Sequence, residues 1–126
     1  MKRPSSHPAV MPYLMLENAA GFSEFVQSVF HASPGLMNKD ADRIVHGELE
    51  IDGSIIMFTD ATAEWKSQTA NMFVYVDNAD ETYQEALKAG AEKIMEPADQ
   101  SYGRSCGVKD PFGNVWWITS VIEQEG

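Results

Sequence analysis

The sequence of 126 residues contains a single cysteine, few basic residues and no long apolar run. Cys106 has no partner in the chain, so an intrachain disulfide is excluded and the cytoplasm is the expected compartment. Nine Lys and Arg stand against 19 Asp and Glu, and the formal net charge of −10 opposes nucleic acids and anionic membrane surfaces. We expect no signal peptide, no membrane span and no nucleic-acid partner.

An internal repeat with an offset of 60 residues organises the chain. Residues 13–19 align with residues 73–79, and residues 53–59 align with residues 113–119. The shared register indicates two copies of one module in a chain whose length suits a single domain, residues 1–126. The identical pairs are Asn18/Asn78, Ala19/Ala79, Gly47/Gly107, Gly53/Gly113 and Thr59/Thr119.

The first copy, about residues 9–60, is predicted to form a strand, a helix and three further strands. Apolar residues at helical spacing predict the helix, and Asp52-Gly53 between apolar runs predicts a hairpin. The predicted elements are a strand at 10–16, a helix from 17–19 to about 30, a short strand near 35–37, a polar loop at 38–42, and strands at 43–51 and 54–60.

The second copy, about residues 70–122, has the same order. Asn78 is placed to cap its helix, and residues 61–69 read as a linker between the copies. The chain is therefore predicted as α+β, with two tandem βαβββ modules forming a curved mixed sheet. The predicted elements are a strand at 71–76, a helix ending near 89–90, a short strand near 91–95, a loop at 96–101, and strands at 103–109 and 114–121.

The two faces of the predicted strands differ, because strand side chains alternate in direction. In the first and last strands of each copy, even positions are almost all apolar and should pack under the helices. Odd positions mix aromatic, thioether and hydrogen-bonding groups, which is typical of small-molecule pockets and also of a half-exposed sheet or a dimer interface. In the strand at 43–51, His46 and Glu48 alternate with the apolar Leu49 and Ile51. They should therefore face away from the helix core, as ligand contacts or as ordinary solvated groups. The other candidates from this face are Met11, Tyr13, Met57, Asn71, Phe73, Tyr75 and Trp117.

Residues 11–19, 74–80, 89–91 and 102–118 together resemble the superfamily of glyoxalase I, bleomycin resistance proteins and extradiol dioxygenases, also called the vicinal oxygen chelate superfamily. The run Asp110-Pro-Phe-Gly113 before an aromatic strand is the most specific part. The resemblance implies one glyoxalase-like domain with the paired βαβββ fold already predicted. It also implies a homodimer.

The metal enzymes of that superfamily hold a divalent ion with four His, Glu or Gln side chains. The resemblance places these ligand positions at Met11, Met57, Asn71 and Trp117. Two thioethers, an amide and an indole are poor ligands for such an ion, so the resemblance implies no metal site and no cofactor here. A metal site at another position, with His46 and Glu48 as ligands, remains an alternative.

Three readings of the function follow. The first is a metal-free small-molecule binding protein whose ligand lies in a cup lined by aromatic and Met side chains. The alternative is a metal-dependent lyase, isomerase or dioxygenase with a relocated site, and the third is a dimeric scaffold. The acidic chain favours a cationic ligand, whereas Arg104 could bind an anionic one or form a structural salt bridge. Tyr102 could add a stacking surface.

Overall fold

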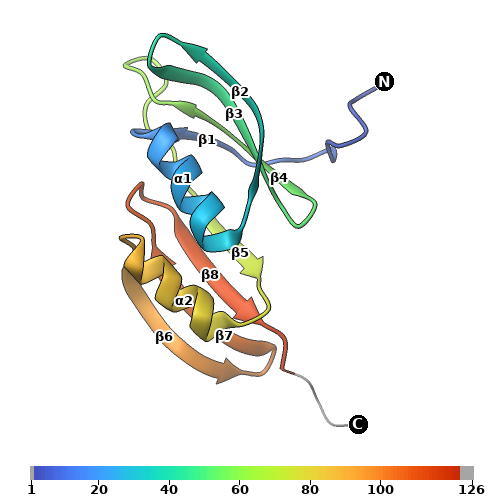
Figure 1. Cartoon of the computed structure of the whole chain (residues 1–126), viewed down its shortest axis with the longest axis vertical. Helices are drawn as coiled ribbons and strands as arrows, with labels where there is room; N and C mark the ends of the chain where they lie inside the picture. The colour runs from blue at the N-terminus through green and yellow to red at the C-terminus, as the bar shows by residue number, and fades with distance from the viewer. Residues whose placement is uncertain (1, 123–126) are drawn as a thin grey trace. The chain divides into compact units, whose positions relative to one another are not determined.

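The computed structural model describes residues 2–122, which form two compact units that divide between Thr69 and Ala70. The elements follow the order β-α-β-β-β in each unit, so the predicted repeat of the module is confirmed (Figure 1). Within the described residues, no helix has the length and apolar character needed to cross a membrane.

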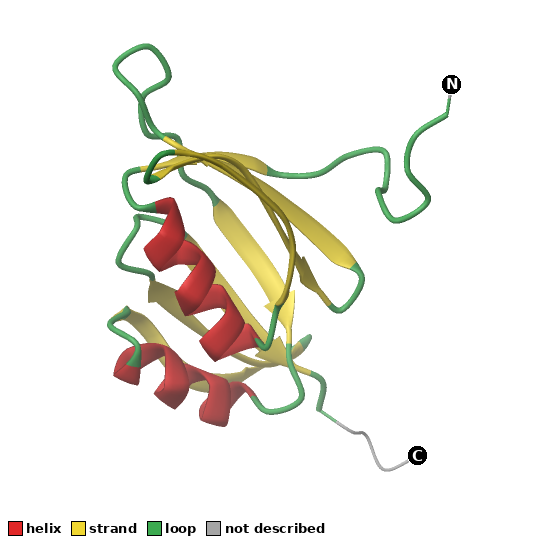
Figure 2. Cartoon of the chain, turned by 45° about the horizontal axis from the view of Figure 1, so that its top comes forward, coloured by secondary structure: helices red, strands yellow, loops and turns green. Residues whose placement is uncertain are grey.

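Unit 1 is a mixed four-stranded sheet with a helix packed on one face (Figure 2). The strand order is β1-β4-β3-β2, with β1 parallel to β4 and the other neighbours antiparallel. Its elements are β1 (Tyr13–Leu16), α1 (Ala19–Phe30), β2 (Ser33–Asp40), β3 (Arg43–Ile51) and β4 (Ser54–Asp60).

Unit 2 repeats this arrangement, with the strand order β5-β8-β7-β6 and β5 parallel to β8. Helix α2 packs on β6, β7 and β8. The elements are β5 (Asn71–Tyr75), α2 (Ala79–Lys88), β6 (Glu92–Gln100), β7 (Gly103–Lys109) and β8 (Val115–Ser120).

The identical residues of the repeat begin the two helices in the same way. Asn18 accepts a hydrogen bond from the backbone N–H of Gly21, and Asn78 accepts one from Glu81, at 3.0 and 3.1 Å. Such an N-cap satisfies a backbone donor that the first helical turn leaves unpaired. The Asn-Ala pair of the repeat is therefore a helix-start signal.

Each unit buries its own apolar core between helix and sheet. In unit 1 the ring of Phe22 on α1 meets that of Phe58 on β4 edge-on, with centroids 5.4 Å apart. In unit 2, Tyr83 and Ala86 of α2 are buried, as are Trp116 and Ile118 of β8. The even strand positions predicted as core are buried, except Val76, which is half-buried and follows β5.

Two predicted loops are wrong over most of their length, because residues 38–40 and 96–100 belong to long edge strands. Residues 38–40 continue β2, and residues 96–100 continue β6. Both strands are exposed along most of their length and contain register shifts against β3 and β7. Their side chains therefore carry no alternating pattern, and backbone pairing to one neighbour holds them in the sheet.

The two units differ in the register of their last hairpin. In unit 1 two residues separate the pair Ile51↔Ser54, whereas in unit 2 residues 110–114 separate Lys109↔Val115. Gly47 therefore pairs with Phe58 on the helix side, but Gly107 pairs with Trp117 on the opposite side. Although they match in sequence, these glycines face opposite sides of their sheets. A shift of one residue in the pairing register turns every side chain of a strand to the other face.

Candidate functional site

Each sheet has one face without a helix, and these two faces carry most of the predicted site residues. In unit 1, Met57 on β4 pairs with Tyr13 on β1 and with Glu48 on β3, so the three lie in one row across the sheet. The ring of His46 lies near that of Tyr13, with centroids 5.9 Å apart. Sequence reasoning thus placed His46 and Glu48 on the correct face.

Glu48 joins two histidines on this face. Its Oε2 lies 2.9 Å from Nε2 of His46, and its Oε1 lies 2.8 Å from Nε2 of His7. The three side chains are only 12 to 25% exposed. The hydrogen bond from His46, supported by His7 and opposed by partial burial, lowers the pKa of the Glu48 carboxyl below its usual 4.5. At neutral pH the carboxylate is therefore ionised and held on both sides.

His7 is the member of this cluster that sequence reasoning missed. It lies in the segment before β1, which has no pattern of its own, and 41 residues separate it from Glu48. A turn precedes it, in which the N–H of His7 donates to the carbonyl of Pro4 at 3.0 Å. Only the fold brings this segment to β3, so no sequence signal could have found the contact.

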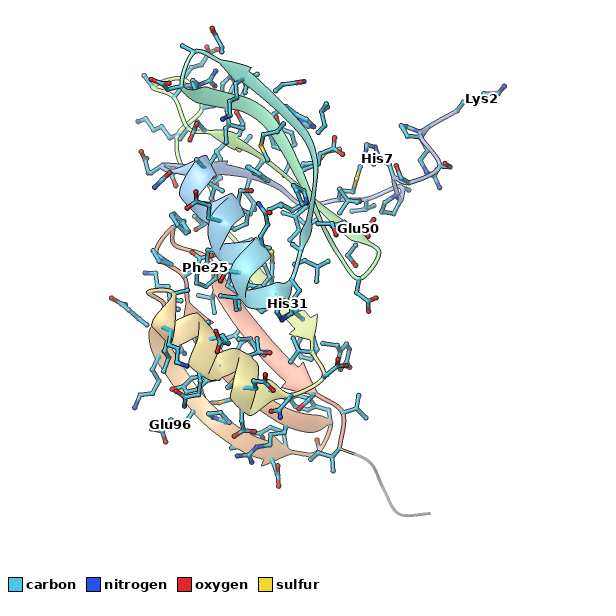
Figure 3. All side chains as sticks on the ribbon, viewed as in Figure 1. Lys2, His7, Phe25, His31, Glu50 and Glu96 are labelled. Carbon is cyan, nitrogen blue, oxygen red and sulfur yellow. The ribbon has the colours of Figure 1, made fainter. Side chains whose placement is uncertain are left out.

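A cavity of about 300 Å³ lies beside this cluster. The N-terminal segment provides Ser6 and His7 as one wall, and β3 provides Glu48 and Glu50. Figure 3 shows His7 on the N-terminal segment, near the strand that carries Glu50. The remaining walls come from residues 33–36 of β2 and from Leu49 and Ile55. The cavity is thus mixed in character, with carboxylates on one side and apolar groups on the other.

The helix-free face of unit 2 is aromatic. Phe73, Tyr75 and Tyr102 are 52, 62 and 56% exposed. The Phe73 ring lies 5.1 Å from that of Tyr75 and 6.3 Å from that of Tyr102, measured between centroids. Phe73 also pairs with Trp117 across β5 and β8. The structure therefore gathers four predicted site residues on one surface.

Trp117 is held against this sheet by two contacts. Its indole N–H donates to Oδ1 of Asn71 at 3.2 Å. Its ring covers Gly107, where a Cβ would lie only 2.6 Å from a ring carbon. The absence of a side chain at Gly107 thus lets the ring lie flat on the backbone. Trp117 and Asn71 act as one preorganised part of the surface.

The positions that the superfamily uses for metal ligands do not fit a divalent ion here. Met11 precedes β1 and Met57 lies in β4, and both offer thioethers. The Asn71 oxygen already accepts from Trp117, whose indole offers only a donor. Within residues 2–122, no three His, Cys, Asp or Glu side chains are arranged to hold a metal ion. The donor chemistry therefore gives no support to a metal at these positions.

Arg104 lies on the helix side of the sheet of unit 2. Its Nε and Nη2 donate to the two carboxylate oxygens of Asp80, at 2.6 and 3.0 Å, and its Nη1 donates to Asp99 at 3.1 Å. These contacts raise the pKa of Arg104 and lower that of Asp80. The guanidinium ties the first turn of α2 to β6 and β7, away from the face that carries Phe73. The structural salt bridge, one of the two alternatives for this side chain, is thus present.

Residues 17–118 match a family model, and that model is described as the "Glyoxalase/Bleomycin resistance protein/Dioxygenase superfamily". An uncharacterized protein of Mycobacterium bovis is 30% identical over 130 residues, covering 93% of this chain and 86% of that protein. Both comparisons reach across the two repeats.

Solved structures share the fold. TioX from Micromonospora sp. ML1 aligns with a TM-score of 0.72 at 20% identity, covering 94% of this chain and all of that one. TnmS3, described as an antibiotic binding protein from Streptomyces sp. CB03234, aligns with a TM-score of 0.71 at 13% identity, covering 92% of this chain and all of that one.

Proposed function

The chain belongs to the Glyoxalase/Bleomycin resistance protein/Dioxygenase superfamily, and from this we propose that it binds a small planar ligand without a resident metal ion. The ligand stacks on the helix-free face of unit 2, on the rings of Phe73, Tyr75 and Tyr102. This function belongs to the binding branch of the superfamily rather than to its metal enzymes.

The observation that carries the proposal is the cluster of three exposed rings on one sheet face. Exposed apolar patches of this kind mark interaction sites, because leaving them in water is unfavourable. The tilts of 74° and 52° between neighbouring rings offer a ligand both faces and edges. A planar compound gains dispersion and apolar burial there, and a planar cation also gains attraction to the ring faces.

The charge of the chain supports a cationic ligand, and the descriptions of its relatives support a drug-like one. The formal net charge of −10 attracts cations and repels anions at long range. TnmS3, which shares the fold, is described as an antibiotic binding protein, and the family name includes bleomycin resistance proteins. A role in sequestering a drug-like cation follows naturally.

The test is calorimetric titration with bleomycin and with the planar cation proflavine, compared with the planar anion anthracene-9-carboxylate. We expect the cations to bind and the anion to bind at least about tenfold more weakly. Phe73→Ala and Tyr102→Ala should each raise the Kd of proflavine about tenfold. The matched control is Trp65→Ala, which removes an aromatic side chain of similar exposure, 60%, from unit 1.

Treatment with EDTA separates this proposal from the metal-dependent alternative. Protein stripped of divalent ions should bind proflavine with unchanged affinity. If binding disappears after stripping and returns with Mn²⁺ or Ni²⁺, the relocated metal site is the better account. If Phe73→Ala and Tyr102→Ala bind as the wild type does, the ligand uses another surface and the proposal is wrong.

A further inference from the structure

The cavity between the N-terminal segment and β3 lies in unit 1 and takes no part in the ring cluster of unit 2. We propose that it is a second binding site, selective for small organic cations with an ammonium or guanidinium group and an apolar body. Glu48 and Glu50 hold the positive charge, and the apolar wall holds the body.

The charge of the lining is the first argument. Two carboxylates, Glu48 and Glu50, line the cavity, and no Lys or Arg is among its described lining residues. Arg3, on the same N-terminal segment, uses its Nε in an exposed hydrogen bond to the carbonyl of His7. A partly enclosed site with carboxylates and no lining cation favours a positively charged guest.

The shape and polarity of the lining are the second argument. Pro34, Leu36 and Ile55 provide the apolar wall. A volume of about 300 Å³ lies at the lower end of the range for small-molecule pockets. Such a cavity accepts an arylalkylamine, whose ring lies on the apolar wall while its ammonium reaches the carboxylates. Metal ions gain nothing from the apolar wall.

The position of His7 is the third argument, because His7 contacts the Glu48 oxygen that the ligand would bind. The Oε1 atom of Glu48 is 2.8 Å from His7 Nε2, while Oε2 is engaged by His46. An ammonium group offers a full positive charge and three N–H donors to a carboxylate, whereas His7 offers one ring nitrogen. The ligand therefore displaces His7 from Glu48, and His46 keeps the carboxylate in place.

The test compares three probes of nearly equal size that differ in charge: 2-phenylethylamine, 2-phenylethanol and phenylacetate. Binding is followed by NMR through the ring signals of His7 and His46 and by calorimetry. We expect the amine to bind, with the larger shift at His7, while the alcohol and the acid bind at least about tenfold more weakly. Equal binding of amine and alcohol would overturn the proposal.

Variants locate the site. Glu48→Gln and Glu50→Gln should each raise the Kd of the amine about tenfold, and Glu64→Gln, an exposed residue outside the cavity, should leave it unchanged. His7→Ala should lower the Kd severalfold because it removes the competing donor. If Glu48→Gln does not fold, Glu50→Gln and His7→Ala decide the matter. Wild-type affinity in both of these variants, or a weaker amine complex in His7→Ala, contradicts the proposal.

The proposals for the two sites can be contradicted independently of each other. Glu50→Gln should leave proflavine binding to the unit 2 rings unchanged, and Phe73→Ala should leave amine binding unchanged. Loss of amine selectivity with intact proflavine binding removes only this second site. Loss of proflavine binding with intact amine selectivity removes only the function proposed for the rings.

Discussion

Asp110, in the loop between β7 and β8, is joined to Trp116 on β8, since Oδ2 of the aspartate accepts the indole N–H at 2.8 Å. The other oxygen, Oδ1, accepts the backbone N–H groups of Phe112 and Asn114, each at 2.9 Å. The amide oxygen of Asn114 accepts from the backbone N–H of Ala70, the residue before β5, at 3.1 Å. The most specific motif of the sequence is therefore structural, since it closes one loop and holds the beginning of another strand.

Replacing Asp110 should destabilise the protein strongly. The side chain is 3% exposed and accepts several hydrogen bonds, so Asp110→Ala leaves buried donors unpaired. We expect a loss of about 3 kcal/mol in the free energy of unfolding, measured with urea. Asp77→Ala, an exposed aspartate before α2, is the control and should cost less than about 0.5 kcal/mol. Equal losses in the two variants would mean that the loop does not depend on this network.

Gly107→Ala should move Trp117 off the sheet. The added Cβ would lie 2.6 Å from the ring, which must shift and give up its hydrogen bond to Asn71. We expect a loss of about 1–3 kcal/mol and a change in tryptophan fluorescence. Gly35→Ala is a matched control, because its Cβ would meet its nearest neighbour at an ordinary 3.5 Å. An unchanged spectrum in Gly107→Ala would show that the ring does not rest on the backbone.

The stability of unit 1 should depend on the ionisation of Glu48. The pKa of this group is lower in the folded chain than its ordinary 4.5, so the ionised carboxylate favours folding. This contribution is complete above pH 4.5 and is lost as the pH falls through the folded pKa. Between about pH 6 and pH 3, Glu48→Gln should therefore lose less stability than the wild type. Glu64→Gln is the control, and a wild-type slope in Glu48→Gln would remove the carboxylate as its source.

Cys106 should be unreactive in the folded protein. Its thiol is fully buried, and burial raises its pKa to about 11, so almost no thiolate forms at pH 8. The native chain should react with Ellman's reagent only as fast as it unfolds, whereas the chain in guanidinium reacts at once. Rapid modification of the native protein would mean that the thiol is accessible.

The sequence predicted the parts of the fold that carry a periodic pattern. The helix and strands of each module were found because apolar residues recur at helical or alternating spacing, and Asp52-Gly53 marked its hairpin correctly. The parallel pairing of the first and last strand also repeats at an offset of 60, since Tyr13 pairs with Met57 as Phe73 pairs with Trp117, but the sequence had not predicted it. Edge strands β2 and β6 lack such a pattern, and their ends were assigned to loops.

The candidate site was predictable only where it depends on strand alternation. Phe73, Tyr75 and Trp117 share a helix-free face, as do Tyr13, His46 and Glu48, and alternation placed both groups. His7 could not be found, because its contact with Glu48 depends on the path of a segment without secondary structure. Arg104 could not be placed either, because its partners Asp80 and Asp99 come from α2 and β6.

The unequal hairpin loops have a consequence for how duplicated modules diverge. His46 and Glu48 lie over Cys106 and Val108 in the repeat, yet the first pair faces away from its helix and the second is buried beneath one. Loop length outside a sheet thus decides which residues of a strand face away from the helix, without any change in the strand itself. Shortening the 110–114 loop by an odd number of residues would turn a different set of side chains outward, a route to new specificity that alters no binding residue.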